Sequence, residues 1–336
     1  MAATHASLAP AEVPAEEYRT LTRACGLLDR SERGKLALTG PGAVEFLNGQ
    51  VTNELAGIRA GEGRYAAFLT HKGKMLGDVR ILALGADPGA EPDELSLDTE
   101  RVALQALFDM IRRFKVGYQV ELHKRTLECG LLSLIGPDSE SPAGAEQLPR
   151  EEHANSRLQI DGVSALAVRT QDGIDLFCEA AASEQLRAAL LARGAAEVSQ
   201  AAAECLRVER GRPRYGVDID DTTIPQEAGL NERAVSFTKG CYAGQETVAR
   251  LYYRGKPNRH LRGLRLSAPA PTGAELALGE RSVGRLGSVA LSPELGPIAL
   301  ALVRREAEPG AVVRVGEHGV TAAVAELPFA LGAPAA

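Results

Sequence analysis

Residues 207–254 read RVERGRPRYGVDIDDTTIPQEAGLNERAVSFTKGCYAGQETVARLYYR. Glycine, proline, arginine and carboxylate residues occur in this stretch at a density unusual for a packed core. Because glycine and proline interrupt helices and strands, the stretch is predicted to be rich in loops, and loops of this kind tend to hold functional residues. The segments on its two sides indicate two different kinds of module.

Upstream of this stretch, short apolar strands alternate with helices, in an order typical of ferredoxin-like β-α-β modules. An α+β fold is therefore expected. The pattern predicts strands at residues 35–38, 64–69, 78–84, 95–97, 118–122, 165–169 and 174–178, and helices at residues 43–48, 99–114 and 181–191.

Downstream, from residue 260, the helical pattern disappears. Short strands alternate with glycine and proline turns at a spacing of about ten residues, which predicts a small β-barrel or sandwich. We therefore expect four parts: a disordered tail at residues 1–20, an α+β region of two intertwined modules at residues 21–257, a β-domain at residues 258–330 and a tail at residues 331–336.

The composition of the 336 residues is that of a globular protein, with 45% hydrophobic and 24% charged residues. A net charge of -6 argues against a dedicated nucleic-acid binder, whose affinity comes from lysine and arginine. No apolar run approaches the ~20 residues that cross a bilayer, and the first residues lack the basic start and apolar middle of a secretory signal. We expect a cytoplasmic protein without a membrane partner.

The five cysteines contain no CxxC motif and no close pair, so neither a disulfide framework nor a zinc site is indicated. The six histidines contain no HExxH motif, and no permanently bound metal is expected. The cysteines, expected to be reduced thiols, are Cys25, Cys129, Cys178, Cys205 and Cys241.

The block KGCYAGQE at residues 239–246 resembles the signature of the YgfZ family of folate-binding proteins, relatives of the glycine-cleavage T-protein. Supporting matches are GPGAVEFLNGQVTNE at residues 40–54, THKGKMLGD at 70–78, GSVALSPELGPIALALV at 287–303 and LPF at 327–329. They extend over roughly nine-tenths of the expected folded region, which a shared loop motif alone does not produce. The resemblance implies a T-protein-like fold.

The resemblance also implies bound tetrahydrofolate or a derivative. Glu227 takes the position whose carboxylate faces the pterin ring in the T-protein family, where it can accept a ring N–H and an amine together. The other expected folate contacts are Lys239, Arg250 and Arg254 for the glutamate tail, and Tyr65 and Tyr252 for ring stacking. The alternatives are that Glu227 caps a turn or pairs with a surface arginine, and that the tyrosines pack in a hairpin or interface.

Cys241 is the expected reactive residue. The nearby ammonium of Lys239 can favour its thiolate, and its small neighbours leave the sulfur approachable. Nucleophile, redox sensor and transient cluster ligand all remain open, as does a buried apolar role. Since an iron-sulfur cluster needs about four ligands, one cysteine cannot hold a cluster without a partner.

Three functions are consistent with these residues. The resemblance implies that the T-protein carries a catalytic aspartate on the helix that follows a strand. In this chain Gln105 takes the corresponding position, and Asp98 lies at the end of the strand. This difference favours a non-enzymatic accessory protein for assembly or repair of iron-sulfur proteins, including enzymes that thiolate tRNA. Its expected partners are folate and iron-sulfur enzymes or cluster carriers.

The alternatives are a folate-dependent aminomethyltransferase or other one-carbon transferase, and an RNA-binding module, although the acidic composition speaks against direct tRNA binding. The cations that an RNA-binding module would use are Arg207, Arg210, Arg212, Arg214, Arg254, Lys256, Arg259 and Arg262.

Overall fold

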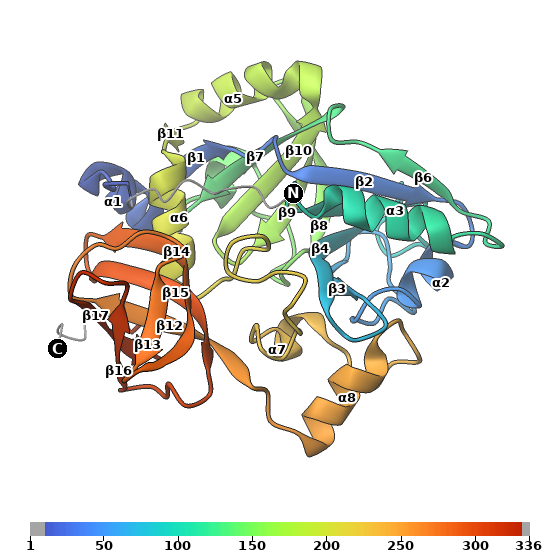
Figure 1. The fold of residues 1–336 in the computed structure, drawn as a ribbon. Coiled ribbons are helices and arrows are strands. Elements are labelled where there is room, and N and C mark those ends of the chain that lie inside the picture. The colour runs from blue at the N-terminus through green and yellow to red at the C-terminus, as the bar shows by residue number, and fades with distance from the viewer. Residues whose placement is uncertain (1–10, 331–336) are drawn as a thin grey trace.

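Two open sheets and one closed barrel form the computed structural model, which describes residues 11–330 (Figure 1). The first sheet has the strand order β11-β1-β7-β10-β9-β8, and its neighbours are antiparallel except for the parallel pair β1 and β11. Its strands are β1 (Gly26–Asp29), β7 (Cys129–Ile135), β8 (Asn155–Ile160), β9 (Val163–Thr170), β10 (Gly173–Glu179) and β11 (Ala196–Glu197).

The second sheet is antiparallel throughout, with the order β3-β4-β5-β2-β6. Its strands are β2 (Gly34–Thr39), β3 (Gly63–Leu69), β4 (Met75–Leu84), β5 (Glu94–Thr99) and β6 (Glu121–Lys124). The chain therefore makes β1 of the first sheet, builds the second sheet, and then returns to complete the first.

The C-terminal β-domain is a closed barrel with the order β12-β15-β14-β13-β16-β17, which confirms the barrel form of that prediction. Its interior is filled by small and branched apolar side chains such as Ala299, Ala301 and Val303. The strands are β12 (Arg259–Leu266), β13 (Glu275–Leu278), β14 (Arg281–Ser292), β15 (Gly296–Arg304), β16 (Val312–Val315) and β17 (Val320–Ala325).

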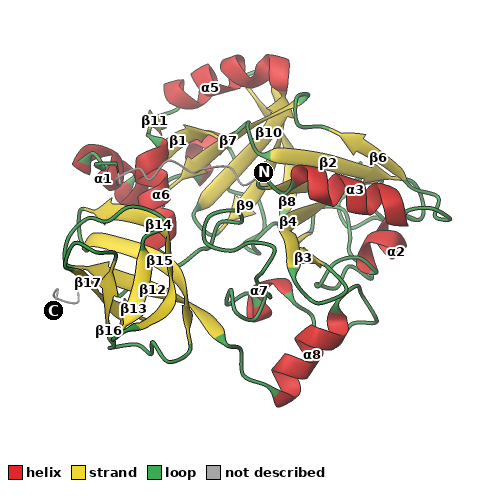
Figure 2. Ribbon diagram, in the orientation of Figure 1, coloured by secondary structure: helices red, strands yellow, loops and turns green. Residues whose placement is uncertain are grey.

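Helices cover the outer faces of the sheets and join them to the barrel (Figure 2). Among the described residues, no helix combines the length and the apolar character that a membrane crossing requires. The helices are α1 (Ala15–Arg23), α2 (Ala43–Asn48), α3 (Leu104–Phe114), α4 (Glu140–Ala143), α5 (Ser183–Ala192), α6 (Gln200–Glu209), α7 (Asn231–Ala234) and α8 (Gln245–Arg254), with a 3₁₀ turn at Ala180–Ala182.

Three predicted boundaries are wrong. The strand expected at residues 118–122 is β6, which begins at Glu121 and ends at Lys124. The helix expected at residues 99–114 begins at Leu104, because Thr99 still pairs in β5 and its hydroxyl donates to the backbone carbonyl of Asp78 at 2.6 Å. The tail expected through residue 20 is wrong for residues 15–20, which belong to α1 and bury Tyr18. Residues 1–10 and 331–336 of the predicted tails lie outside the described residues.

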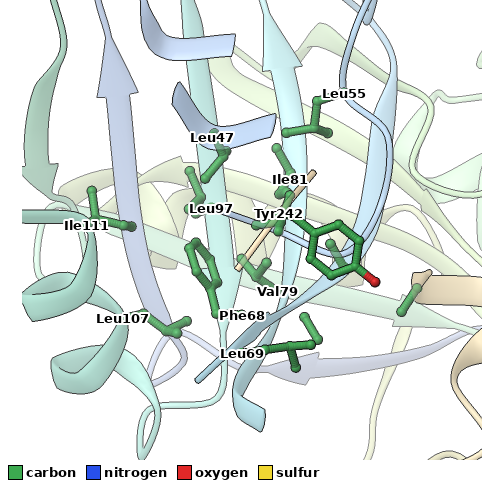
Figure 3. Close-up of a cluster of buried hydrophobic side chains, with 14 of the residues drawn as sticks. Leu47, Leu55, Phe68, Leu69, Val79, Ile81, Leu97, Leu107, Ile111 and Tyr242 are labelled. Atoms are coloured by element: carbon green, nitrogen blue, oxygen red, sulfur yellow. The ribbon is translucent and has the colours of Figure 1, made fainter. Parts of the chain in front are cut away.

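β4 shows how the two open sheets are stacked. Its residues Val79 and Ile81 point into the core beneath α2 and α3, whereas Leu82 and Leu84 join Leu131 and other first-sheet side chains in a second apolar cluster. Successive strand residues point to opposite faces, so β4 is buried on both. Figure 3 shows the core beneath α2 and α3, in which the ring of Tyr242 lies among the labelled side chains.

The barrel docks on α1 and α6 through a buried carboxylate. Tyr18 and Ser292 donate hydrogen bonds to Glu209 at 3.0 and 2.5 Å, and Glu209 is 3% exposed. Burial raises the pKa of Glu209 above its ordinary value, even though both hydroxyls favour the charged form. These contacts tie the N-terminal helix, α6 and the barrel into one unit.

Candidate functional site

The space between the two open sheets is apolar at one end and polar at the other. Along the face of β4 that looks toward the first sheet, Leu84 and Leu82 are followed by Arg80 and Asp78. The polar end opens into a central cleft with a cavity volume of about 220 Å³. It is lined by charged and aromatic side chains that include Arg30, Arg33, Tyr65, Asp78, Arg80, Asp98, Glu100, Glu152, His153, Asp175, Glu204, Arg207, Arg212, Arg214 and Arg233.

Asp78 and Tyr65 form the most unusual pair in the cleft. The register of β3 and β4 makes them diagonal neighbours on one face, and the Tyr65 hydroxyl donates to Oδ2 of Asp78 at 2.5 Å. The other oxygen, Oδ1, is buried and has no hydrogen-bond partner among the described residues. Burial raises the pKa of Asp78, so its carboxyl holds a proton more readily than an ordinary aspartate.

A buried ion-pair network lies behind this pair and bridges the two sheets. Arg80 contacts Asp98 at 2.9 Å within its own sheet and Asp175 at 2.7 Å across the gap, and Arg33 contacts Asp98 at 2.8 Å. Although burial acts in the opposite direction, Arg33 and Arg80 lower the pKa of Asp98 to about 2. Asp98 is therefore held as an ion, and it is poorly suited to replace the missing helical carboxylate as a proton carrier.

His153 contributes a second unsatisfied group to the cleft wall. It is buried, its φ of 75° lies in the left-handed region that side chains rarely adopt, and its Nδ1 has no partner among the described residues. Burial, reinforced by the charge of Arg80, lowers the pKa of His153 to about 4. Strain, a buried unpaired nitrogen and a neutral imidazole are together typical of a functional site rather than of simple packing.

Arginines form the rim of the cleft, and most of them are paired. Arg233 pairs with Glu152 at 2.9 Å, and its guanidinium carbon lies 5.0 Å from the centre of the Tyr65 ring. Arg207 and Arg214 bind Glu204, and Arg207 also binds Asp218 at 3.0 Å. The rim thus presents cations to an entering ligand while keeping the local charge balanced.

The arginine runs expected for an RNA-binding module do not form one open basic surface. Arg207, Arg212 and Arg214 face the cleft, Arg210 pairs with Asp172, Arg259 with Glu227, and Arg262 with Glu326. Arg254 and Lys256 are exposed at the end of α8 and just beyond it.

Glu227 lies in a different cavity, between the barrel and the 216–227 loop, and is 5% exposed. Its Oε2 accepts a hydrogen bond from Arg259 at 2.8 Å and another from the backbone N–H of Ile224 at 3.2 Å. Glu227 therefore makes both of the contacts given above as alternatives to ligand binding, because it caps a turn and pairs with an arginine. Its expected contact with a pterin remains a prediction.

Lys239 is buried and directed into the loop that follows α2. Its Nζ donates to the carbonyls of Asn48, Val51 and Asn53 and to the side chain of Asn48, at 2.6–3.0 Å. Burial lowers the pKa of its ammonium to about 8. Because these oxygens already occupy all three of its N–H groups, Lys239 anchors the KGCYAGQE segment, and its expected contact with a glutamate tail would require breaking these bonds.

Cys241, Arg250, Tyr252 and Arg254 are exposed on the arm formed by α8 and the residues before it. Tyr252 stacks on Phe237 with ring centres 3.7 Å apart. Figure 1 shows α8 at the lower edge of the molecule, beyond β3. The residues predicted for one site therefore occupy several places, and of the expected folate contacts, Tyr65 is the one that lines the central cleft.

Sequence reasoning missed Asp78, Arg80, His153 and Arg233. A signal for the first two was present, because Asp78 and Arg80 are charged residues two positions apart in a strand that is otherwise almost entirely apolar. Gln105, the position expected to carry the catalytic residue, is exposed on α3 and donates to Asp109 at 2.9 Å.

Comparisons with known proteins agree with this architecture. Residues 9–239 match the model of the GCVT N-terminal domain. Aminomethyltransferase from Rubrobacter xylanophilus is 31% identical over 95% of this chain and 86% of its own, and aminomethyltransferase from Streptomyces avermitilis is 31% identical over 88% and 82%. The crystal structure of the glycine cleavage system aminomethyltransferase T from Bartonella henselae superposes with a TM-score of 0.81 at 25% identity, covering 94% of this chain and 89% of that one. The T-protein-like fold predicted from the sequence is confirmed.

Proposed function

Because this chain belongs to the GCVT family, the family of the aminomethyltransferase T-proteins, we propose that it binds tetrahydrofolate in the central cleft and transfers a one-carbon unit to or from it. The observation that carries the proposal is Asp78, a half-buried carboxyl with a raised pKa and a buried oxygen that has no hydrogen-bond partner among the described residues. A folate nitrogen must gain or lose a proton as its bond to carbon changes. Asp78 is the cleft residue best suited to move that proton.

The remaining cleft residues position a flat ligand beside Asp78. Tyr65 is held by its bond to Asp78 and by Arg233 over its ring, so an aromatic face and a cation border the same space. A volume of about 220 Å³ lies below the range that encloses a whole drug-sized ligand. The cleft therefore fits the ring system of a folate, with the rest of the molecule extending past the arginine rim.

Calorimetric titration of tetrahydrofolate tests where the ligand binds. Arg233→Gln should weaken binding about tenfold or more, because a contact with a charged group contributes about 1.5–3 kcal/mol. Arg314→Gln, which changes an exposed arginine of the barrel that lines neither cavity, is the matched control and should leave the affinity within about twofold. Loss of affinity in Glu227→Gln with none in Arg233→Gln would move the ligand to the cavity beside the barrel, and absence of binding to the wild type would reject the proposal.

Cys241 supports a second candidate function, the iron-sulfur accessory role of the YgfZ family. Of the five cysteines it is the exposed one, whereas burial raises the pKa of Cys25 and Cys129 to about 11 and that of Cys205 further. Exposed Tyr252 and Tyr253 lie on the same arm, and tyrosine is a residue type enriched in protein interfaces. We propose that the partner, an iron-sulfur enzyme or cluster carrier, supplies the remaining cluster ligands.

Genetic complementation separates this role from one-carbon transfer. In a strain that lacks the gene, iron-sulfur enzyme activities should fall, and Cys241→Ser should fail to restore them because serine cannot act as a thiolate ligand. Cys129→Ser, in a partly buried position, is the control and should restore them fully. Full rescue by Cys241→Ser would reject the thiol-dependent role while leaving folate chemistry in the cleft untouched.

A further inference from the structure

The largest cavity described above lies outside the central cleft, between the outer wall of the barrel and the 216–227 loop. Its volume is about 1120 Å³. The cleft and this barrel-side cavity are on opposite sides of one loop, since Arg214 lines the cleft while Gly216, Val217 and Asp218 line the cavity. We define the barrel-side cavity by its charged lining residues, which are Lys74, Asp218, Asp220, Glu227, Arg259, Arg285 and Arg304.

The carboxylates of the barrel-side cavity are occupied by partners in the protein. Asp218 accepts bonds from Arg207 and from the backbone and side chain of Ser288, and its side chain has no exposed surface. Asp220 accepts hydrogen bonds within its own turn, from Thr222 and Thr223. Glu227 is paired with Arg259. Two of the three carboxylates are thus neutralised by arginines, and the charge of Asp220 acts on Arg259 rather than forming an ion pair with Arg285 or Arg304.

Two cations of the cavity have no such partner. Arg285 and Arg304 are exposed, and neither forms an ion pair with a carboxylate in the described part of the chain. Glu275 lies directly opposite Arg285 in the register of β13 and β14, yet no ion pair forms between them. Lys74 adds a third charge, with its ammonium on the carbonyl of Thr222 at 2.5 Å.

The strand register places Arg304 beside another arginine of the cavity. Arg304 is directly opposite Arg259 where β15 pairs with β12, and like charges in this position lower the stability of a sheet. On the neighbouring strand, Arg285 is opposite Leu302, which also lines the cavity two residues before Arg304. The three arginines therefore lie on three neighbouring strands of the barrel wall, and the ion pair that forms among these residues is that of Arg259 with Glu227.

We propose that the barrel-side cavity is a second binding site, which takes a ligand with two or more closely spaced phosphate or carboxylate groups on Arg285, Arg304 and Lys74. Arginine binds both kinds of group through paired N–H donors, and such an anion relieves the repulsion between Arg259 and Arg304. Asn258, Thr272 and Ser282 line the same cavity and provide polar groups for the rest of the ligand.

Two kinds of ligand carry such closely spaced anionic groups. One is a free phosphorylated small molecule. The other is a γ-linked glutamate tail on a folate whose ring is in the cleft, and this source rests on the proposed function. The loop around residues 214–218 borders both the cleft and the cavity, so the tail of a ligand in the cleft would cross this loop to reach the second site.

Calorimetry with inorganic pyrophosphate tests the site without folate. Wild-type protein should bind pyrophosphate, and the double variant R285Q/R304Q should bind it at least about tenfold more weakly, since each arginine contributes a charged contact. The control is R314Q, because Arg314 is an exposed arginine of the same barrel that does not line the cavity and bonds to the nearby carbonyl of Gly316. Thermal unfolding of all three proteins checks that they are folded.

A second arm compares tetrahydrofolate carrying one glutamate with tetrahydrofolate carrying three. Tighter binding of the longer form to the wild type, lost in R285Q/R304Q, assigns the site to the tail. Pyrophosphate binding without any effect of tail length assigns it to a free phosphorylated ligand. The proposal is overturned if neither probe distinguishes R285Q/R304Q from the wild type, or if R314Q loses as much affinity. Failure of folate to bind anywhere would reject the proposed function, and the pyrophosphate result would still decide this site.

Discussion

Asp78→Asn should lower the rate of one-carbon transfer about 100- to 10,000-fold, the range that a general acid or base contributes. Asparagine keeps the shape of the side chain and can still accept the bond from the Tyr65 hydroxyl, but it cannot take up or release a proton. The effect should appear in kcat with a small change in KM, since the ring of the ligand keeps its other contacts.

The measurement is formation of methylenetetrahydrofolate from a panel of aminomethyl donors, whose carbon is already at the oxidation level of the methylene bridge. Because burial raises the pKa of Asp78, a reaction that needs its ionised form should gain rate with rising pH through a value above that of an ordinary aspartate. This acid limb should disappear in Asp78→Asn. Asp109→Asn on exposed α3 is the control and should keep both rate and pH profile. Unchanged turnover in Asp78→Asn would remove Asp78 from the mechanism.

Arg80→Leu should lower the free energy of unfolding by about 3–5 kcal/mol, the cost of breaking a buried ion pair by removing one partner. Asp175 would lose its guanidinium partner and Asp98 one of two, both in the layer between the sheets. The exposed pair of Arg64 and Glu62 on the neighbouring strand provides the control, since such pairs contribute about 0–1 kcal/mol.

Urea unfolding of wild type, Arg80→Leu and Arg64→Leu measures both effects. A loss in Arg80→Leu no greater than that in Arg64→Leu would show that the network does not hold the two sheets together. If the expected loss is found, Arg80 both lines the cleft and stabilises the packing of the two open sheets.

Local pattern predicted most of the strands well. The runs at residues 64–69 and 78–84 lie within β3 and β4, and the ten-residue spacing of short strands predicted the barrel, because alternation and turn residues are encoded within a few positions. The N-terminal helix α1 was not predicted, because the contact that stabilises it comes from a residue far away in the sequence. Tyr18 reaches Glu209 at the end of α6, a contact that no local pattern indicates.

The site was harder to predict for the same reason. Tyr65 was chosen for its aromatic ring and does line the cleft, but the chemistry of Asp78 arises from burial and from pairing across strands. Glu227 was chosen by resemblance, yet its partner Arg259 comes from the barrel and fixes its carboxylate. A resemblance can indicate which residues matter, whereas the partners of a carboxylate decide whether it is free to bind a ligand.

The threading of the chain also has a consequence for synthesis on the ribosome. β2 to β6 form a complete sheet from one continuous segment, so this sheet can close as soon as residue 124 has emerged. β1 is made before it, yet its partners β7 and β11 come after it, with β7 beginning at Cys129 and β11 at Ala196. The nascent N-terminal segment must therefore stay unpaired while the second sheet folds, with apolar Leu27 and Leu28 exposed to chaperones or to aggregation in that interval.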